Sequence, residues 1–475
     1  MNAIEVTPEP DPLPALLARQ RAAFLRDGAP SLTQRRADLT RFRAALIGHR
    51  REIETAISAD FGHRSRHETA IMEVGGVAET TSYLLRHLRR FMAPTRRHVA
   101  LPMRAGTARI QYQPLGVVGV MSPWNYPVNL ALAPAITAIA AGNRVMLKPS
   151  EFTPATNALI ARMLGELFPE DQFAVVTGDA DVGRAFSALP FDHLVFTGST
   201  AVGRSVMKAA SDHLVPVTLE LGGKSPTILA NGHRLDQAAA SIAFGKLLNA
   251  GQTCIAPDYA LVPQQDIDAF VAAYGRKVAD YYPDGPTSQD YTAIFNARHH
   301  ARLQGLLEDA RAKGAQVIEV GPRPQAAASR AHTMAPTVVL GVTDSMQIAH
   351  EEIFGPILPV FAYNRIEEAI AFVNARPRPL ALYYFGPDDE RRRKVLAETT
   401  SGNVTINGTI MHIAQDDLPF GGVGPSGMGA YHGVEGFRSF SHAKGIYEQG
   451  RWNLARLLHA PFKQPVDTLL NLILR

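Results

Sequence analysis

The stretch His193-Leu-Val-Phe-Thr-Gly-Ser-Thr-Ala-Val-Gly203 has the pattern of a buried strand, a tight turn and the start of a helix. Such a turn directs backbone N–H groups and the positive end of a helix dipole toward a place where a phosphate can bind. Gly198 and Gly203 would allow a phosphate to approach the backbone closely. The spacing differs from Gly-x-Gly-x-x-Gly, and no Lys-Ser/Thr pair follows as in a P-loop. By itself, the stretch is equally compatible with a structural turn.

The alternation of strand and helix extends on both sides of this stretch. Short apolar runs alternate with helix-like segments between Leu115 and about Leu221. This alternation predicts βαβ units, and therefore a parallel sheet with helices on both faces. Helices are expected before it, from Leu13 to about Met92, with Ser31 and Thr33 as candidate caps. A second α/β alternation is expected after it, with a helix over 235–249. The expected strands are 117–121, 144–147, 173–176, 193–196 and 217–221, then 259–262 and 334–340.

Length, charge and cysteine content narrow the class of protein. A chain of 475 residues predicts two or three domains. The formal net charge of +4 argues against a dedicated nucleic-acid binder. With one cysteine, the fold cannot contain an internal disulfide. The segment up to Asp27 lacks the apolar core of a signal peptide, and no run approaches the ~20 apolar residues that span a bilayer. We therefore expect a soluble, cytoplasmic protein.

Four other segments contain candidate chemistry. Lys148 and Glu151, in Lys-Pro-Ser-Glu, follow a predicted parallel strand, where α/β sheets bind ligands. Both side chains can hydrogen-bond a ribose, and a carboxylate repels a 2′-phosphate, which favours NAD over NADP. Cys254 follows a Gly turn in a loop, which suits an exposed nucleophile better than a core strand does. Glu220 lies in an apolar strand, where burial would raise its pKa toward that of a general base. Asn125 lies in a rigid Pro-Trp-Asn-Tyr-Pro loop and could donate to an oxyanion.

At this point, the chain resembles the aldehyde dehydrogenase superfamily from about Leu16 to Lys444. It is most similar to the class 3 branch, on Ala-Pro-Asp-Tyr (256–259) and the Pro-Phe-Gly-Gly run (419–428). The run 412–420 looks most like the coniferyl aldehyde dehydrogenases of that branch. The superfamily motifs are Pro-Trp-Asn-Tyr-Pro (123–127), Lys-Pro-Ser-Glu (148–151), Phe-Thr-Gly-Ser-Thr (196–200), Leu-Glu-Leu-Gly-Gly-Lys (219–224), Gly-Gln-Thr-Cys (251–254) and Glu-Glu-Ile-Phe-Gly-Pro (351–356).

The resemblance implies a role for each matched residue. Cys254 would be the nucleophile and Glu220 the general base, and Asn125 with the Cys254 N–H would form an oxyanion hole. The implied reaction is oxidation of an aldehyde to its acid through a thioester, in two easier steps instead of one. The cofactor would be NAD, with NADP as the alternative. The residues expected to bind it are Lys148 and Glu151 (adenosine ribose), Gly198, Ser199 and Gly203 (pyrophosphate), and Glu352 and Phe354 (nicotinamide ribose and ring), together with Trp124.

The resemblance also implies a fold and an assembly. A Rossmann-type NAD-binding domain would comprise residues 1–92 and 114–222, and an α/β catalytic domain residues 223–406. A projecting β-arm (93–113) and a later segment (407–445) would mediate oligomerisation, usually as a homodimer. The Pro-bounded, alternating composition of the arm independently suits an exposed edge hairpin. The tail, 446–475, is apolar and predicted to be partly helical. It could pack on the body or a partner subunit, cover the substrate entrance or contact a membrane peripherally.

Alternatives remain for the substrate and for the role of the scaffold. An aromatic aldehyde such as coniferyl aldehyde is implied by the subfamily, with medium- or long-chain aliphatic aldehydes as the alternative. A catalytically silent binding protein on the same scaffold is a remote alternative, which the presence of both Cys254 and Glu220 opposes. No metal site is expected. The pairs His63 and His67, and His299 and His300, have no neighbouring carboxylate pattern, so we interpret them as solvated faces.

Overall fold

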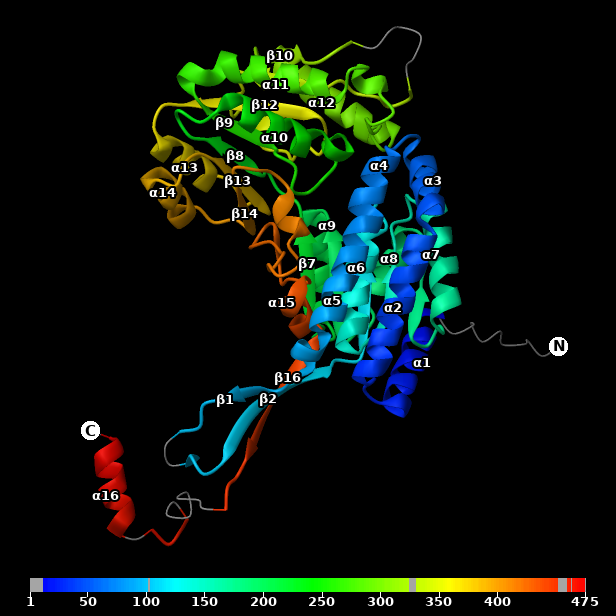
Figure 1. The fold of residues 1–475 in the computed structure, drawn as a ribbon, viewed down its shortest axis with the longest axis vertical. Coiled ribbons are helices and arrows are strands. Elements are labelled where there is room, and N and C mark those ends of the chain that lie inside the picture. The colour runs from blue at the N-terminus through cyan, green and yellow to red at the C-terminus, as the bar shows by residue number, and fades with distance from the viewer. Residues whose placement is uncertain (1–11, 101–102, 324–329, 452–458, 463, 475) are drawn as a thin grey trace, which may run out of the picture.

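The computed structural model describes residues 12–474, except 101–102, 324–329, 452–458 and 463. It has an α/β fold with two mainly parallel sheets and a projecting three-stranded arm, which confirms the predicted fold class (Figure 1). Helices α1 to α5 pack beside the first sheet, and the second sheet forms the other end of the molecule. These N-terminal helices are α1 Pro12–Asp27, α2 Leu32–Gly48, α3 Arg50–Phe61, α4 Arg66–Glu68 and α5 Gly76–Met92, with a π-helical turn at Thr69–Gly75.

The first sheet has the strand order β15-β7-β6-β3-β4-β5. All five strands predicted for it are confirmed, because fully buried parallel strands are short, continuous apolar runs. They are parallel to one another, and only the short β15 is antiparallel. The elements are β3 Val117–Met121, α6 Asn129–Ala141, β4 Arg144–Lys148, α7 Pro154–Leu167, β5 Phe173–Val175, α8 Ala180–Ser187, β6 His193–Gly198, α9 Thr200–Ser211, β7 Val217–Leu221 and β15 Gly427–Met428.

The strand order of this sheet determines where a ligand can bind. The chain leaves β3 toward β4 on one side and returns beside β3 as β6 on the other side. In open α/β sheets, ligands bind at the carboxyl ends of the strands where the order reverses in this way. The carboxyl ends of β3, β4, β6 and β7 lead into the Asn125 loop, Lys148, Ser199 and the segment after Glu220.

The second sheet has the order β10-β11-β12-β9-β8-β13-β14, and only β10 is antiparallel. The strands predicted near 259–262 and 334–340 are present as β9 and β11. Its elements are β8 Pro226–Leu229, α10 Leu235–Leu247, β9 Tyr259–Pro263, α11 Ile267–Tyr281, α12 Ala297–Ala312, β10 Gln316–Glu319, β11 Thr337–Leu340, β12 Ile357–Tyr363, α13 Ile366–Asn374, β13 Ala381–Phe385, α14 Glu390–Glu398 and β14 Asn403–Ile406.

The arm differs from the expected hairpin. Its central strand, β2 Thr107–Pro114, pairs with β1 Thr95–Arg97 and with a distant strand, β16 Ser441–Glu448. The arm therefore has three strands and includes residues beyond 445. The short helix α15 Gly433–Ser439 precedes β16. Within the expected segment 407–445, β15 pairs with β7 of the first sheet. The division into domains at 222 and 406 stays a prediction.

The tail contains the helix α16 Gln464–Ile473, which lies beyond the arm (Figure 1). Leu472 and Leu474 are largely exposed. In the part of the chain that the structure describes, no helix is both long and apolar enough to cross a membrane. Trp452 to Leu458 of the predicted tail lie outside the described residues.

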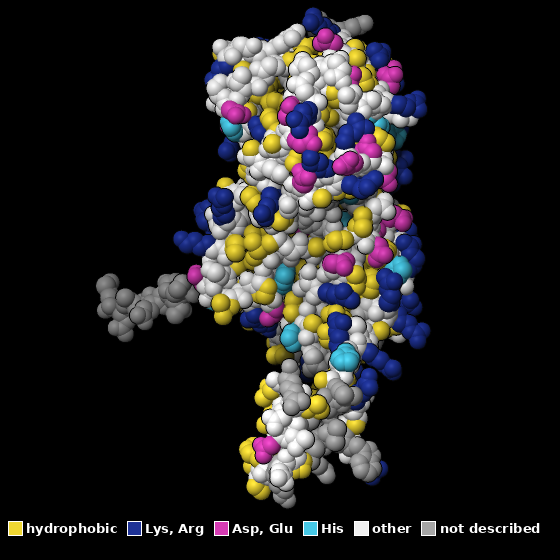
Figure 2. Space-filling model, turned by 90° about the vertical axis from the view of Figure 1, so that its left-hand side faces the viewer, with side chains coloured by type: hydrophobic (Ala, Val, Ile, Leu, Met, Phe, Trp, Pro, Cys, Tyr) yellow, Lys and Arg dark blue, Asp and Glu magenta, His cyan; other side chains and the backbone are white. Residues whose placement is uncertain are grey.

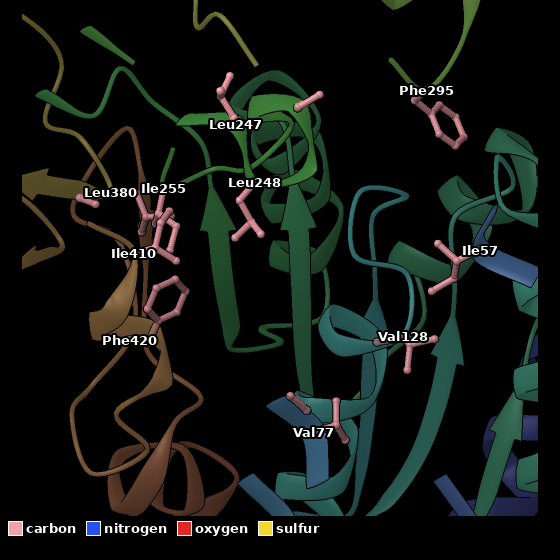
Figure 3. Packing of buried hydrophobic residues seen from close by; sticks show 14 of the residues in the cluster. Ile57, Val77, Val128, Leu247, Leu248, Ile255, Phe295, Leu380, Ile410 and Phe420 are labelled. Atoms are coloured by element: carbon pink, nitrogen blue, oxygen red, sulfur yellow. The ribbon is translucent and has the colours of Figure 1, made fainter. Parts of the chain in front are cut away.

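The largest of three hydrophobic clusters connects the N-terminal helices with both sheets. Figure 3 shows buried residues that reach from α3 and α5 through α6 to α10 and the residue after the cysteine. Ser31 caps α2 by accepting a hydrogen bond from the Gln34 N–H at 3.2 Å, as predicted, whereas Thr33 lies inside the helix. On the face in Figure 2, lysine and arginine side chains are interspersed with acidic ones over the upper part of the molecule. Such mixing is typical of an ordinary solvated surface.

Candidate active site

A cavity of about 290 Å³ lies between the carboxyl end of the first sheet and the turn that precedes Cys254. It brings together eight of the residues that the sequence predicted, from five separate segments. Lys148, Glu151 and Gly203 are not part of its lining. The lining residues are Pro123, Trp124, Asn125, Leu130, Thr197, Gly198, Ser199, Glu220, Leu221, Gly222, Cys254, His299, Arg302, Glu352 and Phe354.

Glu220 lies on β7, with β6 on one side and β15 on the other. The residue is only 3% exposed, and neither carboxylate oxygen has a hydrogen-bond partner among the described residues. Burial raises the pKa of Glu220 well above its ordinary value. The backbone passes so close that a Cβ on Gly421 would lie 3.3 Å from the Glu220 Oε1. This carboxyl is therefore enclosed, unpaired and a strong base once it is ionised.

Cys254 follows an unusual turn at the end of α10. Asn249 and Ala250 both have left-handed backbone angles, with φ of 52° and 51°. Gly251 also has a positive φ of 75°, and a Cβ there would lie 2.3 Å from the carbonyl oxygen of Gly355. A larger residue at Gly251 would therefore push the turn away from this backbone.

The thiol of Cys254 is partly buried, not freely exposed as a simple loop position would suggest. Burial, together with the negative charges of Glu352 and Glu220, raises the pKa of the thiol to about 12. The resting sulfur therefore holds its proton near neutral pH. Attack on a carbonyl requires a nearby base to take this proton, and the cavity presents two carboxyl groups.

Asn125 is buried in the loop between β3 and α6. Its side-chain Nδ2 donates a hydrogen bond to the carbonyl oxygen of Gln252 at 3.0 Å. This hydrogen bond ties the Asn125 amide to Gln252, which stands two residues before Cys254 in the sequence. Asn125 and Cys254 line the same cavity. An N–H donor beside the nucleophile is the arrangement that can stabilise an oxyanion.

An aromatic cluster forms another wall of the cavity. The Trp124 ring stacks on Phe295, with centroids 4.4 Å apart, and meets Phe354 edge-on at 5.6 Å. His299 lies 5.0 Å from Trp124, and burial lowers its pKa. The interpretation of His299 as part of a solvated face was therefore wrong, because α12 turns it into the cavity. Arg302 also lines the cavity. The three-residue spacing of His299 and Arg302 on α12 was the available signal that the two side chains share a face.

Glu352 lies at the cavity wall beside the Gly222–Gly223 turn. A Cβ on Gly222 would come within 2.2 Å of the Glu352 Oε2, so only glycine leaves room for this carboxyl. Burial, together with the charge of Asp258, raises the pKa of Glu352 to about 7. Glu352 can therefore change its charge near neutral pH.

The residues predicted to bind the ribose and phosphates surround the same edge of the sheet. Lys148 is buried at the end of β4, and its Nζ lies 3.2 Å from the Glu151 Oε2. Ser199 caps α9, because its Oγ accepts a hydrogen bond from the Val202 N–H. Gly203 lies one turn inside α9, where a Cβ would lie 2.7 Å from the Leu221 side chain. Packing of α9 against β7 thus explains this glycine without a phosphate contact.

The described residues contain no group of three or more His, Cys, Asp or Glu side chains that could hold a metal ion. Of the two histidine pairs in the sequence, His67 is exposed and bonds Asp290 through its Nδ1 at 3.1 Å. His63 contacts the Gln289 carbonyl.

Comparison with known proteins assigns the class. Residues 14–446 match the family described as "Aldehyde dehydrogenase family", so the chain belongs to the aldehyde dehydrogenases, NAD(P)-dependent oxidoreductases that act on aldehydes. It is 50% identical over 457 residues to a "Probable coniferyl aldehyde dehydrogenase" of Pseudomonas aeruginosa, covering 96% of this chain and 95% of that protein. It is 46% identical over 466 residues to the "Coniferyl aldehyde dehydrogenase" of a Pseudomonas species, covering 97% and 96%.

The fold is also similar to that of a solved relative. A structure described as the substrate-bound state of Staphylococcus aureus AldH matches with a TM-score of 0.91 and 34% identity. The match covers 97% of this chain and 99% of that chain. The likeness therefore extends over nearly the whole length of both chains.

Proposed function

We propose that this aldehyde dehydrogenase oxidises coniferyl aldehyde, or another aromatic aldehyde, to the carboxylic acid through a thioester on Cys254. One observation supports the mechanism most strongly. The Cys254 thiol, the Asn125 loop and the unpaired Glu220 carboxyl all line one cavity. The substrate class is supported by the two coniferyl aldehyde dehydrogenases that match nearly the whole chain.

The residues around the cavity fit NAD. The aromatic wall that contains Trp124 and Phe354 suits a nicotinamide ring, and Glu352 can accept hydrogen bonds from its ribose. The N-terminus of α9 at Gly198 and Ser199 offers N–H groups to the pyrophosphate, and Gly203 lets this helix pack close to the sheet.

The adenosine ribose would bind farther along the same edge of the sheet. The ribose hydroxyls would bind Lys148 and Glu151, and the charge of Glu151 favours NAD over NADP. NADP remains an alternative because the Glu151 side chain is partly exposed and can turn aside.

The chemistry begins at Cys254. Its thiol loses a proton to a cavity carboxylate, and the sulfur forms a bond to the carbonyl carbon of the aldehyde. The carbonyl oxygen becomes an oxyanion, which accepts hydrogen bonds from the Asn125 amide and the Cys254 N–H. Bound NAD supplies the hydride acceptor that turns this hemithioacetal into a thioester.

Glu220 then completes the reaction. Its carboxylate takes a proton from a water molecule, and the resulting hydroxide adds to the thioester carbon. The carbon–sulfur bond breaks, the carboxylic acid leaves and the sulfur is free for another turnover. A carboxylate with a raised pKa is suited to this task, because it binds a proton more strongly than an exposed one does.

We also propose a cytoplasmic homodimer in which the arm and the segment after 407 contact the partner. An arm of exposed and half-exposed strands supports this assembly, because its residues bury little within one chain. The NAD-binding domain (1–92 and 114–222) and the catalytic domain (223–406) would then complete each subunit. The tail from 446 would lie at the subunit contact, with peripheral membrane contact as the alternative.

The test measures NADH formation at 340 nm with coniferaldehyde, benzaldehyde, hexanal and decanal, with NAD and then NADP. Wild type and Cys254→Ala are compared. We expect the highest kcat/KM for coniferaldehyde with NAD and at least a 10³-fold loss in the variant. A preference for decanal would replace the aromatic class with long-chain aldehydes. Turnover that survives in Cys254→Ala would contradict the thioester mechanism, and a wild type that binds NAD but oxidises nothing would indicate a silent scaffold.

A further inference from the structure

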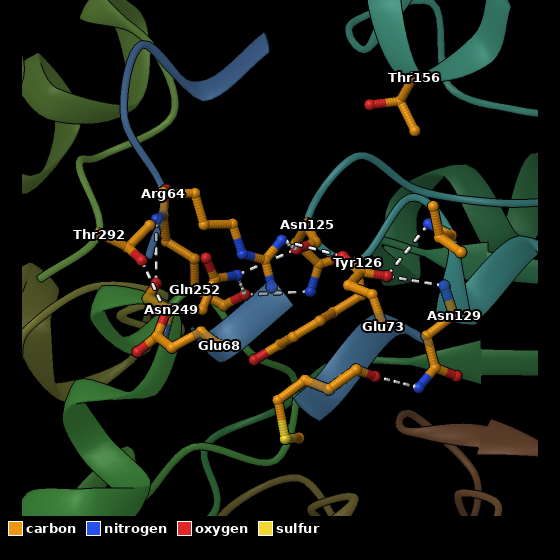
Figure 4. Close-up of polar contacts among 12 residues, drawn as sticks. Arg64, Glu68, Glu73, Asn125, Tyr126, Asn129, Thr156, Asn249, Gln252 and Thr292 are labelled. Atoms are coloured by element: carbon orange, nitrogen blue, oxygen red, sulfur yellow. Dashed lines mark hydrogen bonds and ion pairs between the residues drawn. The ribbon is translucent and has the colours of Figure 1, made fainter. Parts of the chain in front are cut away.

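A buried polar network lies behind the two loops that carry Asn125 and Cys254 (Figure 4). Arg64, Glu68 and Glu73 come from the N-terminal segment between α3 and α5, which contributes nothing to the lining of the cavity. Its charged residues are therefore not needed to contact a substrate or cofactor. The network comprises Arg64, Glu68, Glu73, Asn125, Tyr126, Asn129, Asn249, Gln252 and Thr292.

One half of the network fixes the Asn125 loop. The Nη1 of Arg64 donates to the carbonyl oxygen of Asn125 at 2.9 Å and to the Oε1 of Glu73 at 3.0 Å. The Oε2 of Glu73 accepts from the N–H groups of Val128 and Asn129, at 3.1 and 2.7 Å, where α6 begins. One ion pair thus holds both the carbonyl of Asn125 and the first turn of the next helix.

The position of Arg64 is itself tightly defined. Its side chain is 0% exposed, and its guanidinium lies 4.7 Å from the Tyr126 ring centroid and 5.0 Å from that of Phe61. The Tyr126 hydroxyl is hydrogen-bonded to the Thr253 Oγ1 at 2.8 Å, directly before Cys254. A change at Arg64 would therefore reach both loops.

The other half fixes the turn before Cys254. The carboxylate of Glu68 accepts from the Asn249 N–H through both oxygens, each at 3.2 Å, and from the Thr292 hydroxyl at 2.6 Å. Asn249 is the first of two successive non-glycine residues with left-handed angles, a conformation that persists only when its surroundings enforce it. Glu68 supplies part of that enforcement.

The two halves meet at shared acceptors. The Asn249 Nδ2 donates to the carbonyl oxygens of Asn125 and Gln252, at 3.0 and 3.1 Å. The Asn125 Nδ2 donates to the same Gln252 carbonyl. The backbone of the oxyanion donor and the backbone of the nucleophile loop are therefore joined directly.

We propose that Arg64 and Glu68 are positioning residues for the acylation step. They keep the Asn125 amide and the Cys254 thiol at a fixed separation, so that attack and oxyanion stabilisation occur in one geometry. This inference rests on the roles proposed for Cys254 and Asn125. A displacement of about 1 Å at such a site can lower a rate by about 10²-fold, although neither positioning residue touches the substrate.

The chain offers a matched control in Arg35. Arg35 is also buried and donates to two backbone carbonyls, those of Pro30 at 2.9 Å and Ala140 at 3.0 Å. Ala140 lies at the far end of α6, away from the Asn125 loop. Arg35→Met therefore removes a buried arginine that braces the same helix without reaching the active site.

The experiment compares Arg64→Met, Arg64→Lys and Arg35→Met with wild type, using the aldehyde that wild type oxidises best. We expect Arg64→Met to lower kcat about 10²-fold, while the dissociation constant for NAD, from quenching of protein fluorescence, changes less than about twofold. Arg64→Lys should regain about a tenth of wild-type kcat, because an ammonium can still reach the Asn125 carbonyl. Arg35→Met should lower the melting temperature and leave kcat within about twofold.

A folded Arg64→Met variant with kcat near that of wild type would overturn the inference, as would an equal loss of kcat in Arg35→Met. If Arg64→Met does not fold, Glu68→Gln decides by the same comparison. Its amide keeps one acceptor oxygen, and we expect about a tenfold loss of kcat. Failure of the proposed function would give a different result, namely aldehyde oxidation that survives in Cys254→Ala. That result does not depend on how the Arg64 variants behave.

Discussion

Two regions of the same core contain buried glutamates, and they differ in how these are bonded. Glu220 faces the cavity with both carboxylate oxygens unpartnered among the described residues. Behind the catalytic loops, Glu73 accepts three hydrogen bonds, one of them from its ion-pair partner Arg64. Glu68 accepts hydrogen bonds from Asn249 and Thr292. Burial raises the pKa of all three carboxyls, so burial alone does not separate them.

The difference indicates what each region does. Most buried polar groups in proteins are hydrogen-bonded, because an unpaired one is unfavourable. A carboxyl that receives several hydrogen bonds, such as Glu73, therefore fits a structural or positioning role. A carboxyl that receives none and borders a cavity, such as Glu220, is available to a water molecule or a thiol. The comparison predicts that removing the charge of Glu220 lowers the rate without lowering the stability, whereas removing a charge from the hydrogen-bonded region also lowers the stability.

The largest effect is expected for Glu220→Gln. Without a base to activate water, steady-state kcat should fall about 10³-fold. Acylation should persist, because Glu352 lines the same cavity and can accept the thiol proton. Rapid mixing with aldehyde should therefore give a burst of about one NADH per active site, followed by very slow turnover. A steady-state kcat within tenfold of wild type would contradict the role of Glu220.

Glu73→Gln should show the opposite pattern in stability. It leaves the buried Arg64 without its carboxylate partner, and losing one member of a buried ion pair destabilises proteins by about 3 kcal/mol. We expect a clearly lower melting temperature in calorimetry. Glu220→Gln should instead keep or raise the melting temperature, since it removes an unpaired buried acid. Equal shifts in the two variants would invalidate the comparison.

The sequence alone predicts these two regions unequally. Glu220 is recognisable because it interrupts an apolar strand, where burial follows from the strand itself. Arg64 stands in the short loop before α4, and Glu68 and Glu73 in the helical turns that follow, where all three resemble solvated polar residues. They are buried only because α6 and the turn before Cys254 pack on them. Tertiary contacts of this kind leave no periodic signal in the sequence.

The difference between local patterns and tertiary contacts also explains which strands of the fold could be predicted from the sequence. All five strands of the first sheet that were predicted from apolar runs are present, because each is buried on both faces. In the second sheet, only β9 and β11 were predicted, and β8, β10, β12, β13 and β14 were not. The third strand of the arm, β16, is polar and exposed, and its partner β2 lies more than 300 residues earlier, so only pairing reveals it.

The smallest effect concerns the pH dependence of stability. Burial raises the pKa of Glu68 from an ordinary 4.5 to about 7 in the folded protein. A raised carboxyl pKa means that the folded state holds its proton more tightly than the unfolded state does. The stability that this proton provides is complete below the unfolded pKa and is lost as the pH rises toward the folded pKa. Between pH 5.5 and 7, Glu68 should therefore contribute a loss of about 2 kcal/mol.

Glu68→Gln removes the titration of the Glu68 carboxyl and leaves every other titrating side chain in place. We expect the decrease in melting temperature between pH 5.5 and 7.5 to be smaller in Glu68→Gln than in wild type. Glu166→Gln, a change at an exposed position on α7, is the matched control and should keep the wild-type profile. Identical profiles for wild type and Glu68→Gln would mean that Glu68 keeps an ordinary pKa when folded. The Asn249 and Thr292 donors would then offset its burial fully, and Glu68 would differ from Glu220 even more than the structure indicates.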